Sequence, residues 1–393
     1  MKFRQRTNPN AYSSRNKVQL LKGGREYFDF LSSLIDQCKE SLYLQFYIFL
    51  DDDTGRVVID RLKEAAGRGV KVFLHFDAYA SRGISKNAVQ EMRDAGVHVK
   101  KFEPLLRSRH FYFGRRLHHK VVVADGIHSL VGGRNVSNNY NDLPGSPAWL
   151  DLTVYCQGEA SLTIMQICRQ LWRNQKSLPK IDQAQLEKFY SQIPESEHTE
   201  VRVRRNDWVM SKNQIHRSYL HIFDNAEKNI TIMCSYFLPG SLYKYKMARA
   251  IRRGVKFDVI LAGISDVKMA KNAERYLYRW LLKNKIGIYE YQRTVLHAKT
   301  ATYDNCFVTV GSYNVNNISA HASLELNLDI RDPKFATLVQ EELDDIKEKR
   351  CKQITYENFT KTNNFLRRVW QQFCYIFINN VLKLFTFYFR QEK

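Results

Sequence analysis

The stretch SLYLQFYIFLDDDTGRVVIDRLKEAAGRGVKVFLHFDAY, residues 41–79, decides the fold. Its first part, 41–50, is a short aromatic and β-branched run, which predicts a buried strand. Residues 56–70 have helical periodicity and end in Arg-Gly-Val, and 71–79 is a second apolar run that predicts another strand. A strand, a helix and a strand at this spacing predict a βαβ unit with a parallel sheet, and therefore the α/β class.

The same order of elements recurs in the second part of the chain. Its helix also ends in Arg-Gly-Val, so Gly69 and Gly254 occupy equivalent positions about one domain length apart. This recurrence indicates an internal duplication. We expect two similar α/β halves that pack face to face around one shared site. The second unit is predicted as a helix over 214–229, a strand over 229–239, a helix over 244–255 and a strand over 256–263.

The duplication sets the expected domain boundaries. The chain has 393 residues, which is enough for two or three domains. The seam between the halves is expected in the polar stretch 191–200. We predict a basic N-terminal tail over 1–17, a first repeat domain over 18–195, a second over 196–352, and a C-terminal segment over 353–393.

Composition limits the class of protein and the compartment. Hydrophobic residues make up 44% and charged residues 26%, which is globular and excludes disorder, collagen and a coiled-coil rod. The net charge of +21 favours anionic partners: nucleic acid, acidic lipid head groups or phosphorylated substrates. The seven cysteines are scattered and form no CxxC, so neither a disulfide framework nor a zinc site is expected. The basic N-terminus precedes no apolar run, so we expect no signal peptide and a reducing, cytoplasmic setting.

The segment 365–393 differs from the rest of the chain. Its longest run without charge, Val369 to Leu382, is shorter than the roughly 20 residues that span a bilayer. A wide aromatic face opposite a narrow polar stripe favours an amphipathic helix in the membrane interface. The alternative is a C-terminal helix that packs on the protein's own core. The residues expected to contact the membrane are Trp370, Phe373, Phe377, Phe385 and Phe389.

A second repeated pattern carries the chemistry. Each half contains His-x-Lys, then four residues to an Asp, then six residues to a Gly-[Gly/Ser]-x-Asn sequence, with identical spacing. Six fixed positions arise by chance in a chain of this length about once in 10^5, and here they occur twice. The positions are His118, Lys120, Asp125, Gly132, Gly133 and Asn135 in the first half, and His297, Lys299, Asp304, Gly311, Ser312 and Asn314 in the second.

These residue types suit transfer at a phosphodiester. His-x-Lys on a strand directs both side chains to one face, so packed halves would place two histidines and two lysines in one pocket. One imidazole can attack phosphorus while the other protonates the leaving oxygen. The lysines, with Asn135 and Asn314, would hold the non-bridging oxygens, and Ser312 could add a hydroxyl donor beside Gly133. This chemistry needs no cofactor, and no metal-ligand spacing is present.

A nucleophilic histidine works best when a carboxylate holds its far nitrogen. The candidates are Asp151 in AWLDLTV and Glu325 in SLELNL, since a lone acid in an apolar strand needs a partner. The alternative is that either is an ordinary surface acid. Asp125 and Asp304 belong to the catalytic motif, but we interpret them as turn-forming and structural.

The doubled pattern H-x-K-x4-D-x6-G-[SG]-x-N resembles the phospholipase D superfamily. Most of residues 16–330 is similar to bacterial cardiolipin synthases, in the form that lacks N-terminal transmembrane helices. The resemblance implies two phospholipase D-like halves and phosphatidyl transfer through a phosphatidyl-histidine. It assigns the transfer to His118 and His297; we expect His118 to be the nucleophile and His297 the acid and base, and the alternative is the reverse. The resemblance also implies that each carboxylate supports the histidine of the other half, pairing Glu325 with His118 and Asp151 with His297.

Two positions depart from the family pattern. Gln45 stands where many synthases have Glu, and SYFLPG (235–240) replaces a more usual proline-tyrosine-phenylalanine segment that ends in Asp. Neither departure touches the motif residues, so both bear on acceptor preference and not on activity.

The expected function is a cardiolipin synthase that converts two phosphatidylglycerols to cardiolipin and glycerol. We expect a peripheral protein on the cytoplasmic face of a bacterial membrane, with anionic phospholipids as partners and no nucleic acid. The alternatives are a phospholipase D-type lipid hydrolase, a nuclease, and a non-catalytic lipid-binding protein. Detergent-dependent solubility would favour a lipid enzyme, and salt-sensitive duplex binding would favour a nuclease. The basic patch expected to bind the lipid head group consists of Arg107, Arg109, Arg115 and Arg116.

Overall fold

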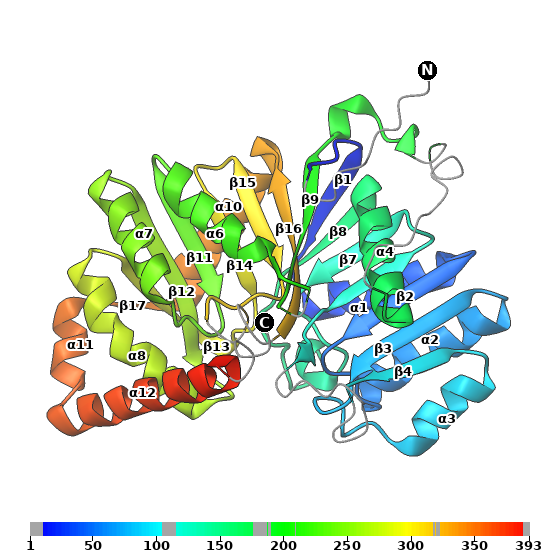
Figure 1. The fold of residues 1–393 in the computed structure, drawn as a ribbon, viewed down its shortest axis with the longest axis horizontal. Helices are drawn as coiled ribbons and strands as arrows, with labels where there is room; N and C mark the ends of the chain where they lie inside the picture. The colour runs from blue at the N-terminus through cyan, green and yellow to red at the C-terminus, as the bar shows by residue number, and fades with distance from the viewer. Residues whose placement is uncertain are drawn as a thin grey trace.

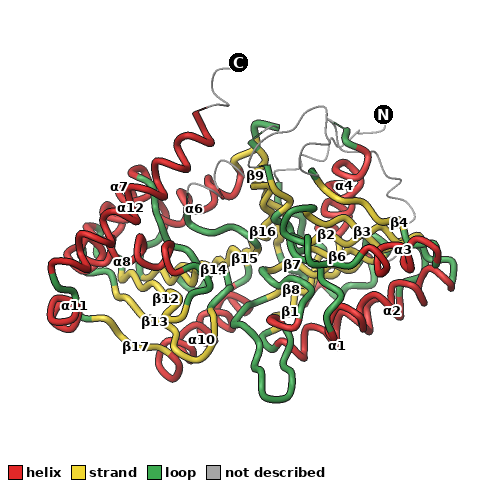
Figure 2. The backbone as a smooth tube through the Cα atoms, turned by 90° about the horizontal axis from the view of Figure 1, so that it is seen from below, coloured by secondary structure: helices red, strands yellow, loops and turns green. Residues whose placement is uncertain are grey.

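The computed structural model describes residues 11–103, 115–175, 187, 190–208, 210–316, 319 and 323–387. Two α/β halves lie side by side, each built around a twisted sheet, with the strands of the two sheets meeting at the centre of the molecule (Figure 1). The same arrangement viewed from below shows helices lining the outer sides of both sheets (Figure 2). This arrangement confirms the predicted fold class.

The first half contains a seven-stranded sheet in the order β1-β8-β7-β6-β2-β3-β4. The short strand β5 belongs to this half in sequence but pairs with the other sheet. The elements are β1 (Asn16–Leu21), α1 (Gly24–Gln37), β2 (Ser41–Phe46), α2 (Asp53–Gly67), β3 (Lys71–Asp77), α3 (Lys86–Asp94), β4 (His98–Phe102), β5 (Arg116–Leu117), β6 (Val121–Ala124), β7 (His128–Gly132), β8 (Thr153–Gly158) and α4 (Glu159–Arg173).

The second half repeats this sheet as β9-β16-β15-β14-β11-β12-β13, with β10 and β17 added at its edges. Two helices, α11 and α12, follow the last strand. The elements are β9 (Glu200–Asp207), β10 (Lys212–Asn213), α6 (Gln214–Asn225), β11 (Asn229–Cys234), α7 (Ser241–Arg252), β12 (Lys256–Ile264), α8 (Lys268–Lys283), β13 (Gly287–Val295), β14 (Lys299–Tyr303), β15 (Phe307–Gly311), β16 (Ser323–Arg331), α10 (Pro333–Arg350), β17 (Cys351–Ile354), α11 (Tyr356–Thr362) and α12 (Phe365–Phe387).

The two sheets have the same strand directions as well as the same order. In each half, the βαβ unit supplies two parallel pairs, β2·β3 with β3·β4 and β11·β12 with β12·β13. The remaining equivalent neighbours are antiparallel. The duplication inferred from the sequence is therefore a duplication of the whole sheet. The predicted strand over 41–50 is shorter than expected, because pairing stops at Phe46.

The repeated Arg-Gly-Val sequence has a structural cause. Gly69 and Gly254 have φ of +90° and +93°, a left-handed conformation that costs glycine nothing and lets the chain turn from helix to strand. The arginine before each glycine binds the end of another helix. Arg68 donates to the carbonyls of Ile35 and Asp36 at the end of α1, and Arg253 donates to those of Phe223 and Ala226 at the end of α6. Each arginine thus satisfies carbonyls at the C-terminal end of a helix, which otherwise lack partners.

The largest apolar cluster joins the two halves. It contains side chains of β6, β7 and β8 together with side chains of β9, β15 and β16, and it is closed by α4 and α10. The outer faces are covered separately, the first sheet by α1, α2 and α3 and the second by α6 and α7. Because one continuous core crosses the seam, the halves are held in a fixed relation at the place where the two motifs meet.

The N-terminal segment is more structured than a tail. Ser13 pairs with Val201 of the second half, and β1 begins at Asn16. Arg15 forms ion pairs with Glu159 and Glu187. The expectation of a tail over 1–17 is therefore wrong from Ser13 onward, because these residues bridge the halves, whereas residues 1–10 lie outside the described part of the chain.

Candidate active site

Two short parallel bridges place each histidine beside the other half. Leu117 of β5 pairs with Leu324 of β16, and the His118 N–H donates to the Leu324 carbonyl at 3.0 Å. In the same way Leu150 pairs with Leu296, and the His297 N–H donates to the Leu150 carbonyl at 2.7 Å. In both cases the residue before a histidine pairs with the residue before a carboxylate.

This register brings the carboxylates onto the histidines. Nδ1 of His118 lies 2.8 Å from Oε2 of Glu325, and Nδ1 of His297 lies 2.8 Å from Oδ2 of Asp151. The pairing across the halves that the family resemblance implied is confirmed. Both acids are fully buried, which excludes the alternative that they are ordinary surface acids. The sequence predicted Asp151 within a strand, but it lies just before β8.

The carboxylates fix which nitrogen of each ring can react. A carboxylate accepts hydrogen bonds, so Nδ1 of each histidine carries the proton and donates it. The lone pair is then on Nε2, at the opposite edge of the ring. Both rings are therefore in the tautomer that a nucleophile or a general base at Nε2 requires.

The two motif lysines lie beside the histidines and are held differently. Nζ of Lys120 donates to the His118 carbonyl at 2.8 Å and lies 5.1 Å from the centre of the Tyr47 ring. Nζ of Lys299 donates to the His297 carbonyl and to Oγ of Ser235 at 2.9 Å. Both lysines are almost fully buried, so their charges act in a medium of low polarity.

Burial dominates the electrostatics of this pocket. It lowers the pKa of His118, and it lowers the pKa of His297 to about 3, with the nearby lysines acting in the same direction. Burial also lowers the pKa of Lys120 and Lys299. Each cation here is costly, and the acids that reduce this cost for the lysines are Glu325 and Asp151, with Asp77 acting on Lys120 and Asp266 on Lys299. A phosphate anion would relieve that cost, so the pocket is suited to a phosphodiester.

Aromatic rings form walls around the histidines, and sequence reasoning missed them. Tyr47 meets His118 edge-on at 4.8 Å between ring centres, and Tyr140 meets His297 edge-on at 5.1 Å. Trp149 lies 6.1 Å from His297. Such rings orient the imidazoles and keep water away from them. With 22 tyrosines in the chain, residue type alone could not single these out; their position after a predicted strand or before a carboxylate was the available signal.

Gly133 and Ser312 serve the carboxylates and not the substrate. A Cβ at Gly133 would lie 2.4 Å from Oδ2 of Asp151, so only glycine leaves room for this acid. At the equivalent position, Oγ of Ser312 donates to Oε2 of Glu325 at 2.5 Å. The expectation that Ser312 offers its hydroxyl to phosphate is wrong, because that proton is used on Glu325.

The two motif asparagines mainly form hydrogen bonds within the protein. Oδ1 of Asn135 accepts the Ile48 N–H at 3.0 Å, and its Nδ2 donates to the Tyr140 hydroxyl at 2.8 Å. Oδ1 of Asn314 accepts from the Cys234 thiol at 3.7 Å. The expected contact with phosphate is thus limited to the remaining amide N–H groups. Asn135 instead positions the tyrosine that packs on His297.

Asp125 and Asp304 lie at the far ends of their strands. Asp125 accepts from the N–H groups of Lys39, Glu40 and Ser41 at the start of β2. Asp304 accepts from the N–H groups of 227, 228 and 229 at the start of β11. Both residues have positive φ, 55° and 50°. These contacts support the interpretation that both are structural, although they belong to the motif that is repeated in the two halves.

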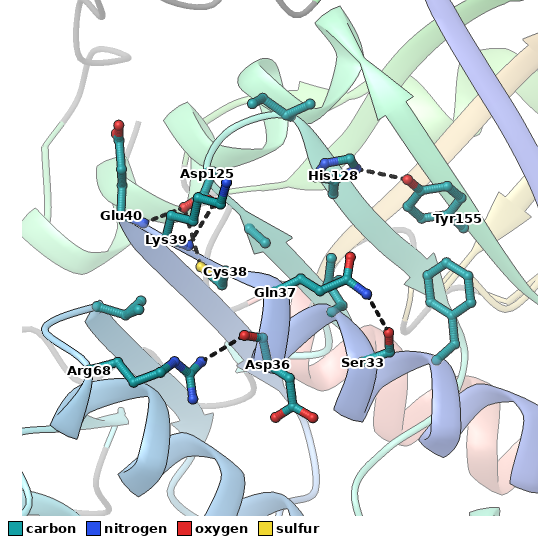
Figure 3. A pocket seen from close by; sticks show the side chains of 15 residues that line it. Ser33, Asp36, Gln37, Cys38, Lys39, Glu40, Arg68, Asp125, His128 and Tyr155 are labelled. Carbon is teal, nitrogen blue, oxygen red and sulfur yellow. Dashed lines mark hydrogen bonds between the residues drawn. The ribbon is translucent and has the colours of Figure 1, made fainter.

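A cavity of about 1000 Å³ lies at this same rear end of the first sheet. Figure 3 shows Asp125 bound to the 38–40 turn on one side, with His128 hydrogen-bonded to Tyr155 on another. The cavity is remote from the histidine pair, since it opens where β2 begins, whereas Tyr47 and His118 lie beyond the end of β2. It plays no part in the site described above.

The expected basic patch is only partly accessible. Arg115 pairs with Asp207 at 3.3 Å and with Glu103 at 3.7 Å, and it is nearly buried. Arg116 lies 3.8 Å from Asp77. The expectation that these two arginines are free for a head group is therefore wrong, because acids of the protein neutralise them. Arg107 and Arg109 lie outside the described residues.

The C-terminal helix α12 packs on α8 by a narrow face and exposes a wide one. Cys374 is buried against Ala273 and Leu277. Trp370, Phe373, Ile376 and Phe377 are about half exposed (50%, 51%, 48% and 45%), and Phe365 and Leu366 near the start of the helix are more exposed still. The helix is therefore both docked and apolar on its outer side. The side chain of Phe385 and the whole of Phe389 lie outside the described part.

Within the described residues, no helix combines the length and the apolar character needed to cross a bilayer.

A family model and individual related proteins both identify the same family. A family model described as "Cardiolipin synthase, PLD-like domain" matches residues 31–145 and 219–347. Cardiolipin synthase B of Escherichia coli K12 is 30% identical over 364 residues, covering 88% of this chain and 86% of that protein. Cardiolipin synthase B of Salmonella typhimurium is 32% identical over 362 residues, with coverage of 88% and 86%.

One solved structure extends the likeness of fold to almost the whole chain. Phosphatidylserine synthase from Haemophilus influenzae superposes with a TM-score of 0.71, covering 96% of this chain and 97% of that chain. The sequence identity is 13%, so this match concerns the fold alone.

Proposed function

Because the chain belongs to the phospholipase D-like cardiolipin synthases, we propose that it joins two phosphatidylglycerol molecules into cardiolipin and releases glycerol. The observation that carries this proposal is the pair of histidines, each hydrogen-bonded at 2.8 Å to a buried carboxylate of the other half. Two histidines so prepared can act on the two sides of one phosphorus atom.

In the first step, Nε2 of His118 attacks the phosphorus of one phosphatidylglycerol. A P–N bond forms, and the bond from phosphorus to the oxygen of the head-group glycerol breaks. His297, protonated when the anionic phosphate enters, gives its proton to that oxygen. Glycerol leaves, and a phosphatidyl group remains on His118, whose positive ring is held by Glu325.

In the second step, the head-group hydroxyl of another phosphatidylglycerol gives its proton to His297 and attacks the phosphorus. The P–N bond breaks, cardiolipin leaves, and His118 regains its lone pair. Protons balance over the two steps, because His297 ends as it began. Lys120 and Lys299 hold the non-bridging oxygens while negative charge builds on them.

The assignment of His118 as nucleophile is supported by its surroundings. Burial opposes a cation on both rings; Glu325 favours the cationic form of His118 and Asp151 that of His297, but the pKa of His297 is lowered as far as about 3. A phosphatidyl-imidazolium is therefore better accommodated on His118.

The setting we propose is the cytoplasmic face of a bacterial membrane, with the protein bound peripherally to anionic phospholipid. The exposed aromatic face of α12 supports this, because rings of this kind favour the bilayer interface. The net charge of +21 supports attraction to acidic lipid.

The decisive experiment is product analysis with phosphatidylglycerol vesicles and no added metal, using mass spectrometry of the lipids. The proposal expects cardiolipin and glycerol. Phosphatidic acid as the only product would make the protein a lipid hydrolase. Absence of lipid turnover, together with cleavage of DNA or RNA, would make it a nuclease.

The roles of the two histidines can be separated by trapping. His118→Ala and His297→Ala should each abolish turnover, and only the His297→Ala protein should accumulate a phosphatidyl adduct with a short-chain donor that needs little protonation of its leaving group. An adduct on His297 in the His118→Ala protein would reverse the assignment. Full activity of either variant would overturn the two-histidine mechanism.

A further inference from the structure

A second cavity lies beside the C-terminal helix, and neither catalytic histidine lines it. It has a volume of about 650 Å³ and is bounded by α7, α8, α11 and α12. Figure 1 shows α12 running along α8 at the outer side of the second half. The volume falls within the range of small-molecule sites, roughly 300–1,000 Å³.

The lining of this cavity has a single sign of charge. Lys244 of α7, Arg279 and Lys283 of α8, and Arg368 of α12 all contribute to it. No Asp or Glu is among the described residues that line it. Four cations from three different helices therefore surround one space, an arrangement that attracts an anion.

These four cations are also free of ion pairs within the described ranges. Their neighbours are not: Lys246, half a turn along α7, pairs with Asp224 at 2.7 Å, and Lys361 of α11 pairs with Glu357 at 2.6 Å. The cavity thus combines unpaired positive charge with a neutral donor, the amide of Gln372, whereas the amide of Gln371 is paired with Asn363. This is the chemistry that binds phosphate oxygens.

The walls of the cavity are aromatic. Tyr276 and Trp280 of α8 and Phe359 of α11 line it, and Tyr276 stacks on Tyr375 of α12 at 4.8 Å. Tyr375 of α12 lines the cavity as well. A ligand that fits must therefore be anionic at one end and compatible with an apolar surface beside it.

We propose that this cavity binds the phosphodiester head group of an anionic phospholipid in the bilayer, as a docking site separate from the catalytic pocket. The lipid phosphate lies among the four cations, and the aromatic walls of the cavity face the rest of the lipid. The site holds the protein on acidic membranes whether or not a given lipid is also a substrate. It does not depend on the reaction proposed above.

The test is binding of the full-length protein to vesicles, measured by flotation, with no turnover required. The probe is phosphatidylcholine vesicles with and without phosphatidylglycerol, and His118→Ala serves as background so that the lipids are not consumed. Arg279→Gln with Lys283→Gln should weaken binding to the anionic vesicles about thirtyfold, with no more than about a twofold change on pure phosphatidylcholine. Lys244→Gln with Arg368→Gln tests the same site from two other helices.

The matched control removes two exposed charges from the first half, Lys71→Gln with Lys86→Gln. An equal loss in this control would mean that diffuse charge attracts the membrane, and would overturn the proposal. Unchanged binding of both cavity pairs would also overturn it. Thermal unfolding of each variant, and turnover of detergent-dispersed lipid by the same variants with His118 intact, show that the fold is retained.

Soluble competitors distinguish a bilayer lipid from free phosphate. Inorganic phosphate and glycerophosphoglycerol are added to vesicle-bound protein at matched ionic strength. The proposal expects neither to displace the protein, because the soluble anions lack the part of the lipid that the aromatic walls face. Displacement by inorganic phosphate would assign the cavity to free phosphate and overturn the lipid assignment.

Discussion

The two lysines of the repeated motif occupy equivalent positions, yet Lys120 lies over the ring of Tyr47 while Lys299 donates to the hydroxyl of Ser235. The carboxylates differ too. Asp151 fits only because Gly133 has no side chain, whereas the longer Glu325 is held by the hydroxyl of Ser312. The backbone that positions these groups is the same in both halves.

The comparison teaches that duplication preserved the geometry and divergence altered the electrostatics. The register of Leu117 with Leu324 and of Leu150 with Leu296 is common to both half-sites. The charge balance is not, because Glu325 favours a cationic His118 while Lys299 opposes a cationic His297. Unequal surroundings are what two unequal roles require.

The largest effect should come from removing the charge of each carboxylate. Glu325→Gln and Asp151→Asn keep the size of the side chain but no longer enforce the proton on Nδ1. We expect each to lower kcat by about 10^4, measured as release of glycerol from phosphatidylglycerol. With a donor whose leaving group needs little protonation, Glu325→Gln should slow formation of the phosphatidyl adduct, and Asp151→Asn its decay. Identical effects of both on adduct formation would contradict the unequal roles.

The next effect concerns stability and should be equal in the two halves. Asp125→Ala and Asp304→Ala each remove an acceptor of three backbone N–H groups at the start of a central strand. We expect each to lower the free energy of unfolding by about 3 kcal/mol, with kcat of the folded protein changed little. Urea unfolding measures the first and turnover at low temperature the second. A large loss of kcat in a folded variant would make these residues catalytic.

A smaller effect should separate the two small residues beside the carboxylates. Gly133→Ala places a methyl group 2.4 Å from Asp151, so the acid must move away from His297. Ser312→Ala removes one hydrogen bond and leaves Glu325 in place. We expect kcat to fall about a hundredfold for the first and about tenfold for the second. The reverse order in turnover assays would show that Ser312 contacts substrate after all.

The smallest effect concerns acid stability. Burial lowers the pKa of His75 to about 3, and both of its ring nitrogens lack a hydrogen-bond partner in the described residues. The unfolded chain, with an ordinary pKa near 6.5, binds a proton that the folded chain refuses. The stability from this histidine is complete above pH 6.5 and is lost as the pH falls toward 3.

Each such histidine costs about 1.4 kcal/mol per pH unit in that window. His75→Phe, which keeps an aromatic ring between Phe102 and Trp172, should remove that slope and stabilise the protein at pH 5 relative to pH 7.5. His119 and His297, whose pKa is also lowered to about 3, should keep a residual slope. The free energy of unfolding is measured in urea at both pH values. If its pH dependence is unchanged in His75→Phe, a compensating charge lies near His75.

Most of the fold was predictable because its signals are local. Arg-Gly-Val predicts a helix end, and the βαβ units predict parallel strands. Because both patterns occur twice, the duplication could be inferred from the sequence. The histidines and lysines were predictable from spacing alone. The pairs of histidine and carboxylate across the seam followed from the family resemblance and not from spacing, and which groups become partners within one half could not be derived. Ser312 was expected to bind phosphate, and only the register of β15 with β16 shows that Glu325 lies closer.

The arginines illustrate the same limit. Arg115 and Arg116 stand just before His118 in sequence, and this proximity suggested a head-group site. Arg115 instead lies against Asp207, nearly a hundred positions away in sequence, which no local pattern reveals. Residues that act through distant neighbours are therefore the ones that sequence reasoning assigns to the wrong partner.

The exchange of carboxylates between the halves has a consequence for how the protein comes into being. During synthesis, the first half emerges with His118 but without Glu325, and with Asp151 but without His297. A partly made or partly unfolded chain holds no complete catalytic pair and is chemically silent toward the lipids around it. Activity therefore requires that the strands of the second half have docked on the first.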